Sequence, residues 1–194
     1  SSAAQFDEFL SGQTLSVMST EGIGEPTLLR LLAHPDVRPI REITIRDQQL
    51  TAQSVQAIMG ADSTAGIHTL HLSGNPLGDA GLQALARSPR LWQIETRHLQ
   101  KVGAGPVGIA ARAASPYLKA RNLELGWQSG GGQGAKALVA ATQVAHLRLE
   151  SAEVGTEGAV ALIEGGRFES LSLIKNPVHL EGLTAVSAHL QSLS

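Results

Sequence analysis

Apolar residues recur along this chain with a spacing that changes, within each unit, from strand-like to helix-like. The segment 67–85 carries its landmarks at Leu70, Leu72, Asn75, Leu77, Gly81, Ala84 and Leu85. Alternate side chains of a strand share one face, so Leu70 and Leu72 are expected to point the same way. The apolar residues after Asn75 fit one stripe of a short helix. Each unit is therefore predicted to be a strand, a turn and a helix.

Residues 168–186 repeat this unit, with the apolar landmarks, the Asn-Pro pair and the glycine at the same spacing. Four further copies show more drift, and the third copy, over 91–109, is the least regular. The copies align on a column of small residues at Ser54, Gly81, Gly105, Gly134, Gly158 and Gly182. An aliphatic column follows at Ile58, Leu85, Ile109, Leu138, Leu162 and Val186. Coincident columns of this kind indicate six structural repeats.

The repeats predict an α/β solenoid, because one unit cannot bury both its strand face and its helix stripe, whereas stacked units can. The apolar pairs expected on adjacent parallel strands, facing the helices, are Ile43/Ile45, Leu70/Leu72, Ile94/Thr96, Leu123/Leu125, Leu147/Leu149 and Leu171/Leu173. Asn75 and Asn176 should bond to buried turn backbone, which would otherwise hold unsatisfied polar groups. We expect a curved array with a parallel sheet lining the concave face and helices on the convex face.

Residues 1–39 lack the repeat pattern, and we expect them to form an α-helical N-terminal cap over the first repeat. Within this segment, residues 27–32 predict a helix with Thr27 as its N-cap. Residues 40–194 hold the six repeats and end on Leu190-Gln-Ser-Leu193, which is the start of a seventh repeat or a short terminal strand. The first interpretation, in which the chain is a fragment of a longer protein, is favoured.

The residues Leu70-His-Leu-Ser-Gly-Asn-Pro-Leu77 and Gly81-Leu-Gln-Ala-Leu85 resemble the leucine-rich repeats of the ribonuclease-inhibitor-like family. Gly134-Ala-Lys-Ala-Leu138 and Gly158-Ala-Val-Ala-Leu162 are similar to the Gly-Ala-x-Ala-Leu helices of its bacterial members. Those members include secreted effectors of plant pathogens, some with ubiquitin-ligase-linked domains. The resemblance implies a fold, whereas function depends on the site. The sequence departs from the family pattern at Leu99, Gly130 and Ala152, where Asn, Leu and Asn are expected.

The composition narrows the choice of partners. The charge balance is near neutral, with 15 Lys+Arg against 17 Asp+Glu, which disfavours nucleic acid or an anionic membrane as the partner. Cysteine is absent, so a disulfide framework and thiol chemistry are excluded. The apolar runs are too short to span a bilayer. Aromatic residues make up only 3% of the chain, so a thin, repetitive core of small aliphatic residues is expected.

Two features that suggest chemistry are better explained by the fold. A phosphate-binding loop needs Gly-Lys-Ser/Thr, but in the glycine-rich segment 130–136 an alanine separates the last glycine from Lys136, so we interpret the segment as a loosened turn. His68, His71 and His98 are expected on or near the sheet, with Glu95 beside His71. They would lie on separate strands about 4.8 Å apart, rather than converge on one metal ion. We therefore predict no metal site, no cofactor and no catalysis by this chain alone.

Side chains on the outer face of the sheet are the candidate binding surface. The middle residues of the apolar pairs are Thr44, His71, Glu95, Glu124, Arg148 and Ser172, and a further column holds Asp47, Gly74, His98, Trp127, Ser151 and Lys175. Arg46, Arg97 and Glu150 lie between these columns. Trp127 falls where solvent is expected, and an exposed Trp is a typical interface anchor. In the alternative interpretation, Trp127 folds over to fill the gap left by Gly130.

We expect the chain to bind a partner protein, as a monomer, through the concave face around repeats three to five. The candidate contact residues are Trp127, Arg97, His98, Glu95, Glu124, Arg148, Glu150 and His71. Their mixed charges suit a protein better than a polyanion. The resemblance implies the recognition domain of a secreted bacterial effector that acts on a host protein. One alternative is the substrate-recognition half of a ubiquitin-ligase-type enzyme with its catalytic domain outside this chain, and another is a structural or carbohydrate-binding surface protein.

Overall fold

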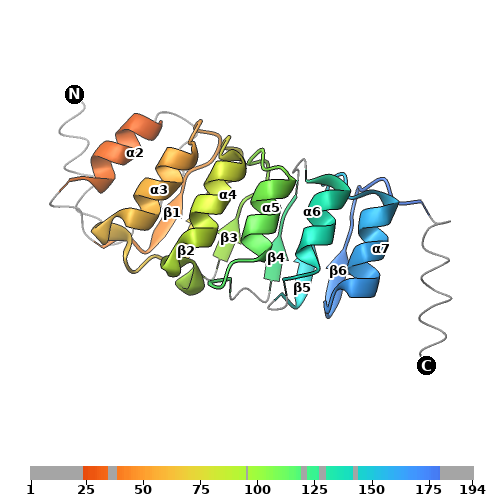
Figure 1. The fold of residues 1–194 in the computed structure, drawn as a ribbon. Coiled ribbons are helices and arrows are strands. Elements are labelled where there is room, and N and C mark those ends of the chain that lie inside the picture. Colours follow the sequence, from red (N-terminus) through yellow and green to blue (C-terminus); the bar gives the residue numbers. More distant parts are fainter. Residues whose placement is uncertain are drawn as a thin grey trace.

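Short strands and helices alternate along the chain in the computed structural model, which describes residues 24–34, 39–94, 96–118, 122–126, 130–141 and 144–179 (Figure 1). The strands are β1 (Glu42–Thr44), β2 (Thr69–His71), β3 (Thr96–His98), β4 (Asn122–Glu124), β5 (His146–Arg148) and β6 (Ser170–Ser172). The α-helices are α2 (Glu25–Leu32), α3 (Ala52–Gly60), α4 (Gly78–Arg87), α5 (Pro106–Ala113), α6 (Gly131–Leu138) and α7 (Gly155–Gly165). Two 3-10 helices, η1 (Asp62–Thr64) and η2 (Pro89–Gln93), precede β2 and β3. Gly182, Val186, Leu190 and Leu193 lie outside the described residues.

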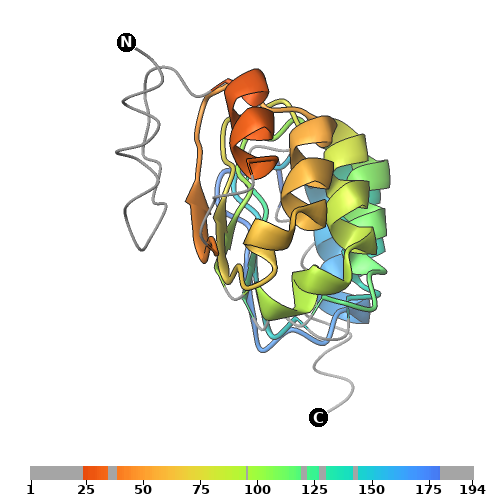
Figure 2. The ribbon, with the colours of Figure 1, turned by 90° about the vertical axis from the view of Figure 1, so that its left-hand side faces the viewer.

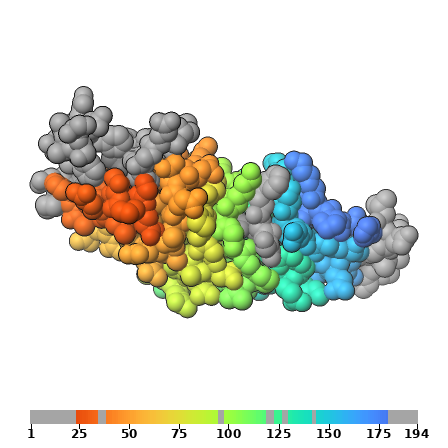
Figure 3. Space-filling model, turned by 90° about the horizontal axis from the view of Figure 1, so that it is seen from above, coloured from red at the N-terminus to blue at the C-terminus, as the bar shows by residue number. Residues whose placement is uncertain are grey.

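The elements form two layers, with the helices side by side over one face of the strands (Figure 2). Strands β1, β2 and β3 form one parallel sheet, and β4, β5 and β6 form a second. The Lys101 main-chain N–H donates to the Gly126 carbonyl oxygen at 3.2 Å, which links the loops that follow β3 and β4. The units succeed one another along the long axis in chain order (Figure 3). The molecule is therefore an α/β repeat fold with short parallel sheets.

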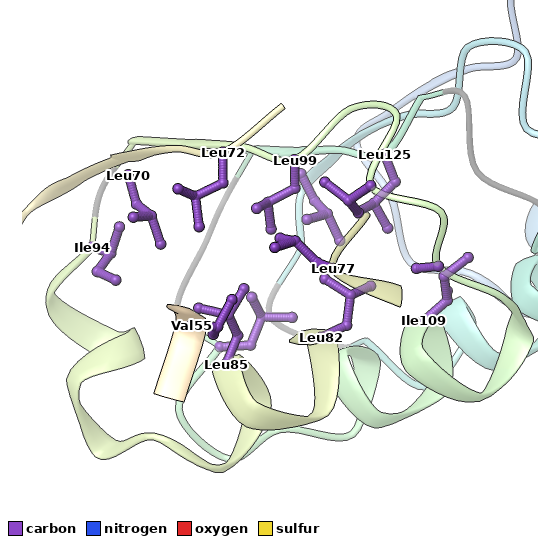
Figure 4. Packing of buried hydrophobic residues seen from close by; sticks show 14 of the residues in the cluster. Val55, Leu70, Leu72, Leu77, Leu82, Leu85, Ile94, Leu99, Ile109 and Leu125 are labelled. Carbon is purple, nitrogen blue, oxygen red and sulfur yellow. The ribbon is translucent and has the colours of Figure 1, made fainter. Parts of the chain in front are cut away.

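The predicted apolar strand pairs face the helices in most repeats. Buried pairs are Ile43/Ile45, Leu70/Leu72, Leu123/Leu125 and Leu147/Leu149. Leu171 and Leu173 are partly buried and pack against the same core. Figure 4 shows Leu70 and Leu72 pointing from the strand layer towards Leu82 and Leu85 on α4. The prediction of parallel strands with these faces turned inward is confirmed for those five repeats.

The predicted register of the third repeat is wrong by three residues. Strand β3 places Arg97 opposite Leu70, so Leu99 and not Thr96 takes the buried position of Leu72. Ile94 is buried, but its N–H donates to the Leu91 carbonyl oxygen in the turn before the strand. Thr64 and Ile67 bond in the same way in the preceding repeat. Ile94 thus belongs to this 3-10 turn, and Leu99 is no departure from the repeat pattern.

The helix column of the third repeat moves with the strand. The separation of Leu70 from Arg97 equals that of Gly81 from Gly108 and of Leu85 from Arg112. Gly108 therefore replaces Gly105 in the small column, and Arg112 replaces Ile109 in the aliphatic column. Gly105 is instead the N-cap residue of α5. Arg112 is 0% exposed, so a guanidinium occupies a position that is apolar in the neighbouring repeats.

The predicted role of the two asparagines is confirmed. The Asn75 Oδ1 atom accepts hydrogen bonds from the main-chain N–H groups of Gln48 (2.9 Å) and Leu50 (3.1 Å). Its Nδ2 atom donates to the carbonyl oxygens of Ile45 and Leu72, both at 2.9 Å. Asn176 bonds equivalent groups of Leu149, Ala152 and Val154. Each asparagine therefore closes the turn of the repeat before its own.

Acidic side chains in the first turn of two helices cap the helix that follows. The Glu25 carboxylate of α2 accepts from the Thr51 N–H at 2.8 Å and the Ser54 hydroxyl at 2.5 Å, at the start of α3. Asp79 of α4 accepts from the Gly105 and Gly108 N–H groups at the start of α5, at 2.6 and 2.8 Å. Helix α2 begins at Glu25 with Gly24 as its N-cap residue, so the predicted N-cap, Thr27, is wrong. Carboxylates thus tie neighbouring helices together at their positive ends.

Candidate functional site

The sheet face, which is the side of the strands turned away from the helices, carries two rows of side chains. The first row consists of the last residue of each strand: Thr44, His71, His98, Glu124, Arg148 and Ser172. The second row lies two residues further along each repeat: Arg46, Ser73, Gln100, Gly126, Glu150 and Ile174. In the first row Thr44 is buried and the others are half-buried or exposed. These rows bring residues from six repeats onto one surface.

The structure changes which predicted residues are neighbours. His98 lies in register with His71 in the first row, where Glu95 was expected. In the further column that begins with Asp47 and Gly74, the residue after Gly74 is Lys101 and not His98. Lys101 and Gly74 share a positive φ angle, of 55° and 75° respectively. Arg97 has its main chain at the register of Leu70, so Gln100 and not Arg97 is the counterpart of Arg46. All three corrections follow from the shift in the third repeat.

We call Arg46, His71 and His98 the histidine cluster. These side chains lie on the sheet face of the first three repeats. The Arg46 Nη2 atom lies 3.0 Å from His71 Nδ1. The imidazole rings of His71 and His98 meet edge to face, with centroids 4.0 Å apart. Burial lowers the pKa of His71, the charges of His98 and Arg46 lower it further, and Glu42 opposes them. Because Arg46 can only donate, His71 Nδ1 accepts, and the ring is neutral with its proton on Nε2.

Polar side chains connect the middle repeats laterally. The Ser73 hydroxyl donates to Gln100 Oε1 at 2.6 Å, and Gln100 Nε2 donates to Glu124 Oε2 at 3.3 Å. Between Gln100 and Glu150 the second row has only Gly126, where a Cβ atom would lie 3.1 Å from the Glu150 carbonyl oxygen. Gln100 was not among the predicted site residues. Alignment of Leu99 with Leu72 would have found it, because Gln100 follows Leu99 as Ser73 follows Leu72.

A cluster of both charge signs covers the last two described repeats. Glu150 accepts from Lys175 Nζ at 2.8 Å, and Arg148 Nη2 lies 3.7 Å from the other Glu150 oxygen. The hydrogen bond from Lys175 and its charge lower the pKa of the Glu150 carboxyl, burial raises it, and Arg148 adds a smaller lowering. Ile174, in the same row, is exposed. One indication of this site was present in the sequence, because Ile174 is an aliphatic residue directly after the apolar pair Leu171/Leu173 and belongs to none of the apolar columns.

Of the two tryptophans, the structure describes Trp92 but not Trp127. Trp127 and Glu95 lie outside the described residues, and the Arg97 side chain does too. Trp92 lies on η2, before β3, with 56% of its surface exposed. The space beside Gly130, which the alternative interpretation assigns to Trp127, is where the Ile109 side chain lies.

The described residues hold little else that resembles a ligand site. Within them, no three His, Asp or Glu side chains are grouped as a metal site would require. The interpretation of the glycine-rich segment 130–136 as a loosened turn is wrong for most of its length, because only Gly130 lies in a turn, where it is buried, and residues 131–136 belong to α6. None of the helices in the described ranges is both long and apolar enough to cross a membrane. A shallow groove on the helix side, between α4 and α5, is lined by residues that include Arg87, Val107, Ala111 and Tyr117.

One copy of the repeated unit matches a family of known proteins. Residues 67–86 match the family model described as Leucine Rich repeat. These residues hold β2 and nearly all of α4. No curated protein matches the chain. The match supports a leucine-rich-repeat family, whose motif suggests a protein–protein interaction module.

Proposed function

We propose that this chain binds a partner protein through its sheet face, as a monomer. The contact surface would comprise His71, Glu95, Arg97, His98, Glu124, Trp127, Arg148 and Glu150. The observation that carries the proposal is the mixed and laterally bonded polar surface of the two rows. Charges of both signs, held in defined positions by hydrogen bonds, favour selective pairing with another protein over the capture of a polyanion.

Preorganisation supports the same conclusion. Ordering side chains during association costs roughly 0.5–1.5 kcal/mol for each long side chain that is immobilised. On the sheet face, Glu150 and Gln100 already hold hydrogen bonds to neighbours in adjacent repeats. A partner that binds here therefore meets side chains that have lost part of their freedom.

The finer parts of the proposal concern shape and biological setting. We propose that the repeats curve, with the sheet face concave, because stacked repeats with helices wider than strands commonly produce such binding surfaces. Curvature would let one partner reach several repeats. The Gly-Ala-x-Ala-Leu helices support the proposal that the partner is a host protein and that this chain is the recognition domain of a secreted bacterial effector.

A pair of photo-crosslinking variants tests the sheet face. A photo-reactive residue at Arg148 should capture the partner, whereas one at Val107, 58% exposed on the helix side, should not. With the captured partner identified, Glu124→Lys should weaken binding about tenfold or more, because the reversed charge faces groups that pair with a carboxylate. Val107→Ser is the matched control. Normal binding of Glu124→Lys together with lost binding of Val107→Ser would place the site on the helices instead.

Trp127 provides a separate test of the same surface. If it is a central contact, Trp127→Ala should weaken binding by about 2 kcal/mol, roughly thirtyfold, at unchanged stability. If it packs against the protein instead, the variant should lose stability and bind normally once folded. Isothermal titration and urea unfolding on the same samples separate the two results.

A further inference from the structure

We propose that the histidine cluster, Arg46, His71 and His98, is a subsite for a carboxylate in an acidic peptide segment of the partner. This inference rests on the proposed function and names the chemistry of one part of it. Arg46 is exposed and His71 and His98 are half-buried. Three consecutive repeats therefore contribute one nitrogen-bearing side chain each to one spot on the sheet face.

The geometry leaves the cluster short of an acceptor. The Arg46 guanidinium donates to His71 Nδ1, a neutral nitrogen, at 3.0 Å. A guanidinium binds a carboxylate more strongly, through two parallel N–H···O bonds. A carboxylate that takes up the Arg46 donors releases His71 Nδ1. That nitrogen can then accept a proton from solvent and become a second charged donor to the ligand.

The surrounding charges favour a single acid group. The His71 ring is faced by Glu42 and Arg46 from the first repeat and by His98 from β3. Glu124 lies next along the first row after His98. The carboxylates of Glu42 and Glu124 thus border the cluster on both sides and would repel a continuous row of phosphates. An acidic side chain on a peptide presents its charge at one point and fits between them.

Proton uptake makes the binding depend on pH. In the free protein, burial and the electrostatic effects of His98 and Arg46 hold the pKa of His71 below its ordinary value of 6.5. A bound carboxylate favours the charged ring and raises that pKa. Between the two pKa values, binding takes up one proton, so affinity rises as the pH falls, by at most tenfold per pH unit. The gain ends near pH 5, where peptide carboxylates begin to be protonated.

NMR titration of the complete chain tests the subsite. The probe is an acetylated Gly-Glu-Gly amide, which presents one acidic side chain, and its Gly-Gln-Gly counterpart is the control peptide. Between pH 7.5 and 5.5, the Gly-Glu-Gly peptide should shift the His71 and His98 ring signals in a saturable way and raise the pKa of His71. His71→Gln should remove the pH dependence, and Arg46→Gln should weaken binding about tenfold. His146→Gln is the matched control, because His146 is exposed on the same sheet face and lies 3.9 Å from Glu169.

Several results would overturn the proposal. They are the absence of peptide-induced shifts at His71 and His98, an unchanged pH dependence in His71→Gln, and tighter binding of a single-stranded RNA oligonucleotide at the same rings. These failures are distinct from failure of the proposed function. If the peptide does not bind but Glu124→Lys still weakens partner binding, only the subsite is wrong. If crosslinking places the partner on the helices, the proposed function is wrong as well.

Discussion

Asn75 shows how one side chain stabilises the turn that follows a strand. It is 0% exposed, and its amide satisfies two main-chain N–H groups and two carbonyl oxygens of buried turns. Without it these groups would be buried with no water to replace the lost bonds. Asn176 makes equivalent bonds but is only partly buried.

Asn75→Ala is therefore expected to lower the free energy of unfolding by roughly 2–4 kcal/mol, because each unsatisfied buried polar group is costly. Asn176→Ala should cost about half as much, since water can reach part of that turn. Urea unfolding of the two variants checks the order. A larger loss for Asn176→Ala would contradict the role assigned to burial.

At the scale of elements, the distance between neighbouring helices depends on the size of the residue in the small column, which is Gly108 on α5 and Gly134 on α6. A Cβ atom at Gly108 of α5 would lie 2.8 Å from the Asp79 Cα atom and 2.7 Å from Asp79 Oδ1. The main chain of α4 cannot yield to it cheaply. A Cβ atom at Gly134 of α6 would instead meet the Ile109 Cδ1 atom at 3.1 Å, the end of a flexible side chain.

We expect Gly108→Ala to destabilise the protein by about 1–3 kcal/mol through overpacking, beyond the roughly 1 kcal/mol that alanine returns as helix propensity. Gly134→Ala should be close to neutral or slightly stabilising. Thermal unfolding followed by circular dichroism compares them directly. Equal midpoints for the two variants would show that α4 and α5 can move apart without cost.

At the scale of the whole molecule, one continuous core joins the repeats. A single cluster of buried side chains runs from Leu28 on α2 to Leu162 on α7. Each helix packs on the next one along the chain, from α2 to α7. Stability is therefore shared between neighbouring repeats rather than centred on one nucleus.

A leucine inside this array should contribute more to the free energy of unfolding than its counterpart near the end of the described repeats. Leu147 on β5 is 2% exposed, and Leu147→Ala is expected to cost roughly 2–5 kcal/mol. Leu171, at the same register on β6, is only partly buried, so Leu171→Ala should cost about half as much. Chemical denaturation of both variants tests this. A smaller loss for Leu147→Ala would show that the repeats are not stabilised by their neighbours on both sides.

The sequence predicted the candidate site less completely than the fold. His71, Glu124, Arg148 and Glu150 lie on the sheet face as their position beside the apolar pairs indicated. The pairing of His71 with His98 was missed, because it depends on which residue of the third repeat lies beside β2. The bonds of Gln100 and Lys175 were missed because lateral contacts between repeats have no spacing along the chain.

The sequence by itself determined the alternation of strand and helix, the inward faces of five strands and the two asparagines of the turns. These follow from burial periodicity within one unit, which is local. Only the tertiary structure decided the register of the third repeat, the burial of Arg112 and the histidine cluster. The reason is that η2 takes up the residues between α4 and β3, and the hydrogen bonds to β2 set where the strand begins. The number of residues between α4 and β3 can be read from the sequence. Which of them belong to the turn and which begin the strand cannot.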